Sequence, residues 1–390
     1  MAGPCVQYNH HLTDVFTGGS PLSRQISSSL LRPGMRLGRT LYDEHGRVLL
    51  SKGVEIRETF IDKIQRDFAV VYIDDEVTEG IDIKEAVPME LRLETQTILR
   101  DQWDLWKNNV TLDKVSIDRD IAKSMRDQMK NLLSIIQGTT ILEEDLASVA
   151  TYDNQTYIHS INVAIYAMII GVSMGLTDSM LIDLGLGAML HDIGKIWVPK
   201  EILNKPGKLT SEEYEQIKKH AELGHEVLVK QHELSYLVAH CAFQHHERLN
   251  GSGYPRGLVG DEIHLFGKIL AVADVYDAMV MHRPYRRGML PSEVMEYLYS
   301  KVETEYDLNI VALFSKKVSM YPIGTEVKLS DGRTAIIKNT NPNFPGRPIV
   351  RIIQNERGQP TTIEEVNLID HLYLTIVNAH DGAIMDFFVD

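Results

Sequence analysis

An adjacent histidine and aspartate, His191-Asp192, stand in the apolar stretch AMLHDIGK, and two adjacent histidines, His245-His246, follow in HHERLNGSGYP. Imidazole and carboxylate groups suit ions such as Fe, Mn, Zn or Ni, and no thiolate accompanies them to select a softer ion. A charged pair in an apolar stretch is costly unless its charge is compensated. The spacing therefore predicts a metal centre that works on a phosphate ester.

Further candidate ligands lie on both sides of these two pairs. The full set is His159, His191, Asp192, His220, His245, His246 and Asp274. An octahedral ion accepts about six ligands and must keep some positions open for catalysis. The set exceeds that demand, whereas two ions bridged by Asp192 would retain open positions for water and substrate. A two-metal centre is therefore the better interpretation.

Charged neighbours of these ligands are suited to phosphate binding. Lys195 lies four residues after the first histidine of the pair, which on a helix places it on the same face. Arg283 and Arg286, three apart in HRPYRRG, can clamp a phosphate in a bidentate manner. Asp277 follows Asp274 by three residues and can orient either that aspartate or one of the histidines. Each feature alone has a simpler structural explanation, and their joint occurrence in order favours a site.

Composition narrows the class of protein. The net charge of -14 argues against binding of a nucleic-acid polymer, which needs a basic surface. The two cysteines, Cys5 and Cys241, are too few for a disulfide framework and fit a reducing cytoplasm. No basic start followed by an apolar run opens the chain, and the apolar stretch 161–174 is expected to be a buried core helix. We therefore expect a cytoplasmic protein without a membrane anchor.

Changes in composition and in hydrophobic periodicity divide the 390 residues into five parts. We expect a flexible arm over 1–28, a small α/β accessory module over 29–78, a helical connector over 79–146, a helical catalytic domain over 147–318 and a β-rich module over 319–390. The fold class is accordingly mainly α. The connector is expected either to pair with itself or a partner, as in a homodimer, or to pack on the next domain.

Three segments closely resemble the HD-GYP domain, a branch of the HD phosphohydrolases. They are AMLHDIGKIWVPKEILNKPGKLTSEEYEQIKKHAELG, HHERLNGSGYPRGL and ILAVADVYDAMVMHRPYR. The resemblance covers about residues 147–318 and implies an all-helical HD-type fold. It also implies a metal-dependent phosphodiesterase that hydrolyses cyclic di-GMP, a bacterial second messenger, to pGpG, GMP or both.

The resemblance assigns roles by position. The motif TYIHS supplies His159, IKKHAELG supplies His220, and ADVYDAM supplies Asp274, so that all seven candidate ligands match family metal ligands. The catalytic residues it implies are Asp192 and Lys195. The substrate-binding residues it implies are Lys195, Gly253, Tyr254, Pro255, Arg283 and Arg286. The Gly253-Tyr254-Pro255 loop is linked in this family to contacts with GGDEF-type cyclases.

One position departs from part of the family. Some members carry a glutamate four residues before the first histidine, which adds a ligand for a third metal, and here that position is Gln155. An amide is a poorer ligand for a hard cation than a carboxylate, so two divalent ions are expected. Fe and Mn are favoured over Zn and Ni.

Two other functions stay open at this point. The first is an effector that binds a cyclic dinucleotide or a GGDEF partner without turnover, although the complete ligand set disfavours it. The second is an HD-GYP hydrolase of a hybrid cyclic GMP-AMP dinucleotide. The terminal modules resemble accessory segments that often flank HD-GYP domains. This resemblance does not identify a ligand for either module.

Overall fold

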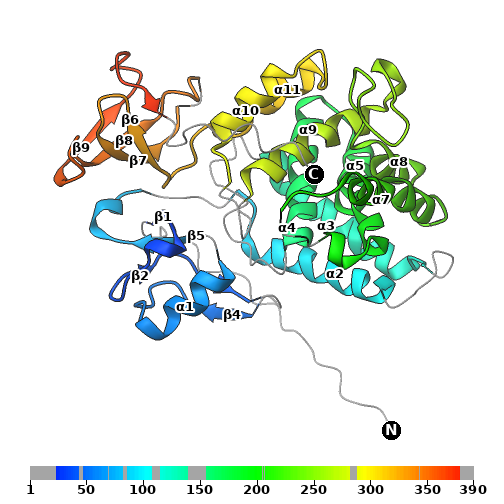
Figure 1. Ribbon diagram of the computed structural model, residues 1–390, viewed down its shortest axis with the longest axis horizontal. Helices are drawn as coiled ribbons and strands as arrows, with labels where there is room; N and C mark the ends of the chain where they lie inside the picture. Colours follow the sequence, from blue (N-terminus) through cyan, green and yellow to red (C-terminus); the bar gives the residue numbers. More distant parts are fainter. Residues whose placement is uncertain are drawn as a thin grey trace, which may run out of the picture.

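The computed structural model describes residues 23–43, 47–68, 70–81, 86–107, 115–138, 155–203, 205, 207–281, 288–341 and 343–377. A helical body formed by the middle of the chain lies on one side of the molecule (Figure 1). Two small modules, one N-terminal and one C-terminal to it in the chain, stack on one another at its other side. This architecture confirms the expected mainly α class with a small sheet module at each end. Residues 1–22 of the expected arm lie outside the described residues.

The helical body runs from Val87 to Val318 around one continuous hydrophobic core. Its helices are α2 (Met89–Lys107), α3 (Arg119–Gly138), α4 (Gln155–Ser173), α5 (Asp178–Leu190), η6 (Ile193–Trp197), α6 (Lys200–Leu203), α7 (Ser211–Val229), α8 (Tyr236–Gln244), η7 (Gly260–Glu262), α9 (Leu265–Val280), α10 (Pro291–Ser300) and α11 (Leu308–Ser315).

Helix α4 is the central element of this body. It packs against α5 and α9 and also contacts α2, α3 and α11. Its length and hydropathy would suffice to cross a membrane, but 78% of its most apolar window is buried inside the protein. The apolar residues of α4 therefore form core contacts, as expected for the stretch 161–174.

Local sequence signals set where the site-bearing helices begin and how closely they approach. Thr210 caps α7, with Glu213 returning the hydrogen bond in a capping box. Gly194 lies in η6 where this short helix meets α7. A Cβ on Gly194 would lie 1.9 Å from the carbonyl oxygen of His220, so only glycine permits this approach. The segment after the HD pair is thereby held against the helix that carries His220.

The connector helices α2 and α3 belong to the helical body. Both pack against α4, and α3 also contacts α5. Trp103, Met125 and Met129 lie in the same core as the helices that follow. Of the two expectations for this segment, packing on the next domain is therefore the one the structure describes, and a homodimer stays a prediction.

The N-terminal module is a small α/β unit. Its elements are β1 (Arg24–Ser27), η1 (Ser28–Leu30), β2 (Arg36–Leu37), β3 (Leu41–Tyr42), β4 (Val48–Leu50), α1 (Glu58–Asp67), β5 (Val70–Asp74) and η2 (Glu76–Thr78). The antiparallel order is β1-β5-β2, with β3 and β4 forming a separate pair.

The C-terminal module is one antiparallel sheet in the order β10-β6-β7-β8-β9. Its strands are β6 (Glu326–Leu329), β7 (Thr334–Asn339), β8 (Ile349–Gln354), β9 (Pro360–Asn367) and β10 (Ile376–Val377). The alternating runs in the sequence predicted such a sheet.

The two terminal modules dock on each other, which the sequence did not predict. The backbone N–H of Gln25 donates to the carbonyl of Gly324 (3.1 Å), and the Arg351 guanidinium donates to the carbonyl of Val77 (3.0 Å). A small apolar cluster is shared between them, formed by Tyr72, Ile81, Ile323, Ile336 and Ile353. The two terminal modules therefore form one unit beside the helical body.

Candidate metal centre

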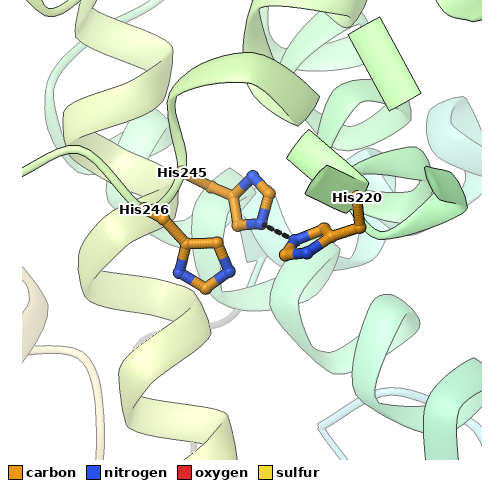
Figure 2. A group of neighbouring side chains, drawn as sticks. All are labelled: His220, His245 and His246. Carbon is orange, nitrogen blue, oxygen red and sulfur yellow. Dashed lines mark hydrogen bonds between the residues drawn. The ribbon is translucent and has the colours of Figure 1, made fainter. Parts of the chain in front are cut away.

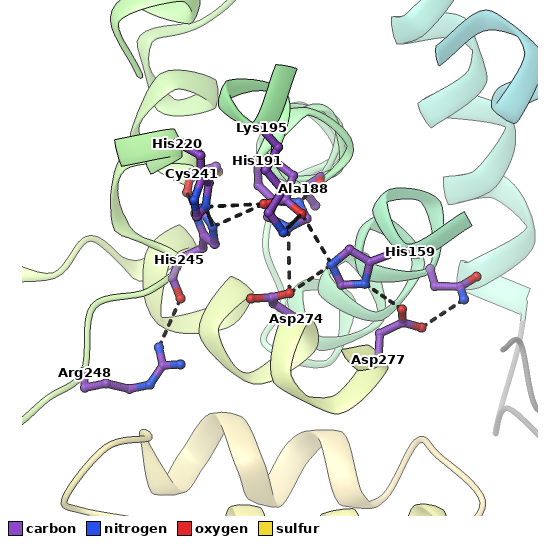
Figure 3. Close-up of polar contacts among 12 residues, drawn as sticks. His159, Ala188, His191, Lys195, His220, Cys241, His245, Arg248, Asp274 and Asp277 are labelled. Carbon is purple, nitrogen blue, oxygen red and sulfur yellow. Dashed lines mark hydrogen bonds and ion pairs between the residues drawn. The ribbon is translucent and has the colours of Figure 1, made fainter. Parts of the chain in front are cut away.

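The structure brings all seven predicted ligands together, although the first and the last are 115 residues apart in the chain. His159 lies on α4, His220 on α7 and Asp274 on α9, while the HD pair and the histidine pair directly follow α5 and α8. Figure 3 shows the side chains of His159, His191, His220, His245 and Asp274 converging from these elements.

The ligands fall into two groups of three. The His159 group consists of His159, His191 and Asp192, and the His220 group of His220, His245 and His246. Within each group, one ligand atom per residue lies within 4.8 Å of the others. Figure 2 shows the three imidazoles of the His220 group facing one another. A further set, His191, His245 and Asp274, joins the two groups.

Asp192 belongs to the His159 group and also faces the His220 group, with one oxygen turned toward His191 and the other toward His220. Its Oδ1 lies 3.4 Å from Nε2 of His220, and its Oδ2 lies 3.4 Å from Nε2 of His191. The carboxylate is 1% exposed in side-chain terms. This is the position that a carboxylate bridging two ions would take.

Buried atoms without partners test whether the site fits metal ions. Nε2 of His191 and Oδ1 of Asp192 are buried and have no hydrogen-bond partner among the described residues. Leaving such groups unsatisfied costs about 1–3 kcal/mol each. Nε2 of His220 and Nε2 of His245 lie 3.1 Å apart, so both nitrogens point to one position. The residues therefore fit divalent ions.

Backbone carbonyls fix the histidine tautomers in a form suited to ligation. Nδ1 of His191 donates to the carbonyl of Ala188 (2.7 Å) and Nδ1 of His220 to that of Ile217 (2.6 Å). Nδ1 of His245 donates likewise to Cys241, at 3.1 Å. These bonds leave each Nε2 with a free lone pair, as metal-ligating histidines require.

Electrostatics differ between the two groups. Burial lowers the pKa of His220 to about 4, despite the nearby Asp192, and lowers the pKa values of His245 and His246 well below normal. Burial would also lower the pKa of His159, but its hydrogen bonds to Asp274 and Asp277 outweigh burial and raise the pKa to about 10. Neutral imidazoles thus make up the His220 group, and His159 is protonated in the metal-free protein.

Both aspartates of the site are ionised. Burial would raise the pKa of Asp192, but His191 and Lys195 lower it well below its usual range. Burial acts in the same way on Asp274, where the hydrogen bond from His159 lowers the pKa. The site therefore presents two carboxylates to a cation.

Asp277 orients His159 and not its neighbour Asp274, an alternative that the spacing alone left open. Oδ2 of Asp277 accepts a 2.7 Å hydrogen bond from Nδ1 of His159. Figure 3 shows this carboxylate behind the imidazole, on the side away from the other ligands. Nε2 of His159 then faces Asp274, at 3.0 Å from Oδ1.

The expected geometry of Lys195 was wrong. Helix α5 ends at Leu190, His191 forms its C-cap, and Lys195 lies in the 3₁₀ helix η6, so the two residues do not share one α-helical face. A 3₁₀ segment turns by three residues, and its side chains repeat at i and i+3. Lys195 is accordingly paired with Asp192, with Nζ donating to Oδ2 at 2.7 Å.

The Gly253-Tyr254-Pro255 loop packs directly on the ligands. The Tyr254 ring stacks on His246 with centroids 4.5 Å apart and planes 25° apart. A Cβ on Gly253 would lie 2.4 Å from the carbonyl oxygen of His246, which excludes larger residues. This loop therefore supports the His220 group. Arg283 and Arg286 lie outside the described residues.

Glu247 and Arg248, which follow the histidine pair, were not among the predicted site residues. Glu247 is 1% exposed and accepts hydrogen bonds from the backbone N–H groups of Arg256 and Leu258, both at 2.9 Å. Arg248 donates to the carbonyls of His245 (3.2 Å) and Glu247 (2.9 Å). These two charged residues fix the loop to the ligand pair, and their position beside it was the available signal.

Comparison with protein families matches residues 138–310 to the HD domain and residues 326–386 to a KOW domain associated with HD domains. The matched segment 138–310 contains the motifs that resemble the HD-GYP domain. Its His and Asp clusters can hold divalent metal ions, as HD phosphohydrolases do.

Several curated proteins are similar to this chain. A cyclic di-GMP phosphodiesterase of Pseudomonas aeruginosa is 34% identical over 57% of this chain and 53% of its own length. A cyclic di-GMP phosphodiesterase of Thermotoga maritima is 40% identical over 42% of this chain and 45% of its own. A 3'3'-cGAMP-specific phosphodiesterase of Vibrio cholerae is 38% identical over 42% and 35%, respectively. The chain thus spans about half, or less, of the length of these relatives.

Proposed function

We propose that this protein is a metal-dependent phosphodiesterase that hydrolyses cyclic di-GMP to pGpG, GMP or both. The observation that carries the proposal is the pair of buried ligand groups on either side of Asp192. The similarity of the HD domain to cyclic di-GMP phosphodiesterases supports the choice of substrate.

The ligand residues are assigned to two ions. Fe or Mn is favoured over Zn or Ni. The His159 group with Asp274 holds one ion, the His220 group holds the other, and Asp192 contributes to both. Ions held by these residues would act as Lewis acids toward a phosphoryl oxygen and would lower the pKa of water, which would supply a nucleophile at neutral pH. The neutral imidazoles donate lone pairs without first losing a proton.

Lys195 is proposed to bind the phosphate that is cleaved. Its Nζ is held by Asp192, and 26% of its side chain is exposed, so its charge stands where the buried ligands meet solvent. An ammonium there offsets negative charge that develops on a phosphoryl oxygen. Arg283 and Arg286 are assigned to the second phosphate on the family resemblance alone.

Gln155 supports two ions over three. It begins α4 one turn before His159, where a glutamate would direct a carboxylate to the same helix face. Gln155→Glu is expected to add a metal ion and to raise the share of GMP among the products. Unchanged stoichiometry and products in that variant would contradict this part of the proposal.

A second substrate is favoured by a specific observation. Two relatives in Vibrio cholerae named as 3'3'-cGAMP-specific phosphodiesterases are 38% and 43% identical to this chain, over 42% and 38% of its length. Hydrolysis of a hybrid GMP-AMP dinucleotide is therefore the alternative reaction.

Binding of a cyclic dinucleotide or of a GGDEF protein through Gly253-Tyr254-Pro255, without turnover, is the non-enzymatic alternative. A cytoplasmic location and a homodimer complete the proposal.

Hydrolysis by anaerobically purified protein loaded with Fe(II) or Mn(II) tests the proposal. Cyclic di-GMP and 3'3'-cGAMP are supplied separately, and products are resolved by chromatography. Turnover of cyclic di-GMP that disappears in Asp192→Ala supports the main proposal, and faster turnover of 3'3'-cGAMP supports the alternative substrate. Binding without turnover by the fully loaded protein would leave only the effector function.

A further inference from the structure

Asp277 uses both of its oxygens inside the protein, and only one of them serves His159. The other, Oδ1, accepts a 2.9 Å hydrogen bond from Nδ2 of Asn162. Asp277 and Asn162 are both fully buried. Asn162 lies three residues after His159 on α4, which places the two side chains on one helix face.

A third buried polar residue reaches Asn162 from another helix. Nη2 of Arg92, on α2, lies 3.5 Å from Oδ1 of Asn162, and Arg92 is 7% exposed. An asparagine amide has one oxygen that accepts and one nitrogen that donates. Because the arginine can only donate, it favours the orientation in which the amide oxygen faces α2 and the amide nitrogen faces Asp277.

This chain of contacts sets the direction of the metal-ligating nitrogen of His159. His191, His220 and His245 are oriented by carbonyls of their own helices, whereas His159 depends on a carboxylate from α9. A carboxylate with one unsatisfied oxygen in the interior would be costly and free to turn. Asn162 holds it in place, and Arg92 holds Asn162.

We propose that Asn162 and Arg92 are positioning residues for His159, through which helix α2 sets the affinity of the metal ion in the His159 group. Helix α2 (Met89–Lys107) precedes the segment 138–310 that matches the HD domain, so the ligand is oriented from outside that domain. The N-terminal module directly precedes α2 in the chain. A displacement of α2 would act through these contacts on the subsite that contains His159, and none of these hydrogen bonds leads to the His220 group. This inference rests on the proposed metal centre.

The experiment measures metal retention in Mn(II)-loaded full-length protein during titration with a chelator, with two ions per chain expected at the start. Asn162→Leu removes the donor to Asp277 and should release the ion of the His159 group at chelator concentrations about 10–100-fold lower. The second ion should be retained as in the wild type. Arg92→Met should shift the same ion in the same direction, and Arg92→Lys should restore part of the affinity.

Thr95→Val is the matched control on the same helix. Thr95 is 1% exposed and bonds to Leu91 and to Gln128 on α3, so the change removes a buried polar contact of α2 that does not lead to His159. The control should keep both ions, and thermal unfolding of each variant identifies those that fold. If Asn162→Leu does not fold, Arg92→Met alone decides.

The outcomes separate this inference from the proposed function. Equal weakening of both ions in Asn162→Leu and Arg92→Met, or no weakening of either, would overturn the positioning role while leaving the metal centre intact. Wild-type protein that binds no Mn(II) would overturn both. Selective loss of one ion in both variants, with Thr95→Val unchanged, is the result that supports the inference.

Discussion

The two ligand groups lie next to each other but are prepared for metal in different ways. The His220 group consists of imidazoles that burial keeps neutral, with two of its members oriented by backbone carbonyls. In the His159 group, His159 carries a proton and is oriented by Asp277. The His220 group is therefore ready to bind at neutral pH, whereas the His159 group must first release a proton.

The two groups therefore need not bind their ions with equal affinity. His220 and His245 are oriented by carbonyls of their own helices, whereas His159 depends on the Asp277 carboxylate and on contacts that extend to α2. Control of activity by loss of one ion would therefore act on the His159 group.

The largest effect is expected from the residue that both groups share. Asp192→Ala should lower the affinity for both ions and the rate of hydrolysis by more than about a hundredfold, since loss of an outer partner alone costs about 10–100-fold. Metal content and turnover are measured on the same sample. Asp183→Ala, on α5 and paired with Arg126, is the matched control and should leave both unchanged. Loss of only one ion in Asp192→Ala would show that the carboxylate does not serve both groups.

Proton release should distinguish the two ions. His159, with a pKa of about 10, is protonated at pH 7 and must lose its proton to bind, whereas His220, with a pKa of about 4, is already neutral. The affinity of the His159 group should therefore rise by up to about tenfold per pH unit above pH 7, and that of the His220 group should stay nearly constant. Calorimetric Mn(II) titrations in two buffers of different ionisation enthalpy count the protons. Equal proton release on binding of the first and the second ion would contradict this difference between the two groups.

Acid should destabilise the metal-free protein through the His220 group. The folded pKa of His220 is about 4, below the ordinary value of 6.5, so the unfolded state binds the proton first as pH falls. The stabilising contribution is present above pH 6.5 and is lost between about 6.5 and 4, at a cost of about 1–3 kcal/mol. Denaturant unfolding across this range measures it, with His220→Gln as the variant that should show a weaker dependence. An unchanged dependence in His220→Gln would speak against the assignment.

The smallest effect concerns the loop that supports the His220 group. Tyr254→Leu removes the ring that stacks on His246 and should weaken this ion by about fivefold, from a stacking contribution of about 1 kcal/mol. Tyr254→Phe keeps the ring and should bind both ions as the wild type does. A loss of metal affinity in Tyr254→Leu that is confined to the His159 group would contradict the assigned role of the loop.

Much of the site could be predicted from the sequence because short motifs carry it. His191-Asp192 and His245-His246 each bring two ligands to one helix end, and their residue types identify metal chemistry without knowledge of the fold. The mainly α class followed from helical periodicity over most of the chain. The carry-over of individual roles, and the domain boundaries, stay predictions.

The remainder depends on packing that no local pattern encodes. Arg92 and Asn162 are seventy positions apart and meet only because α2 packs on α4. The four-residue spacing from His191 predicted that Lys195 lies on the same α-helical face, but the chain changes to a 3₁₀ helix directly after the HD pair. The docking of the terminal modules joins Gln25 to Gly324 and is equally remote in sequence.

The most direct test of a two-ion phosphodiesterase is the rate of cyclic di-GMP hydrolysis as Mn(II) is added stepwise to metal-free protein. We predict that the first equivalent, bound by the His220 group, gives little activity and that turnover rises with the second equivalent. Full activity after one equivalent, or no activity after both are bound, would contradict the account.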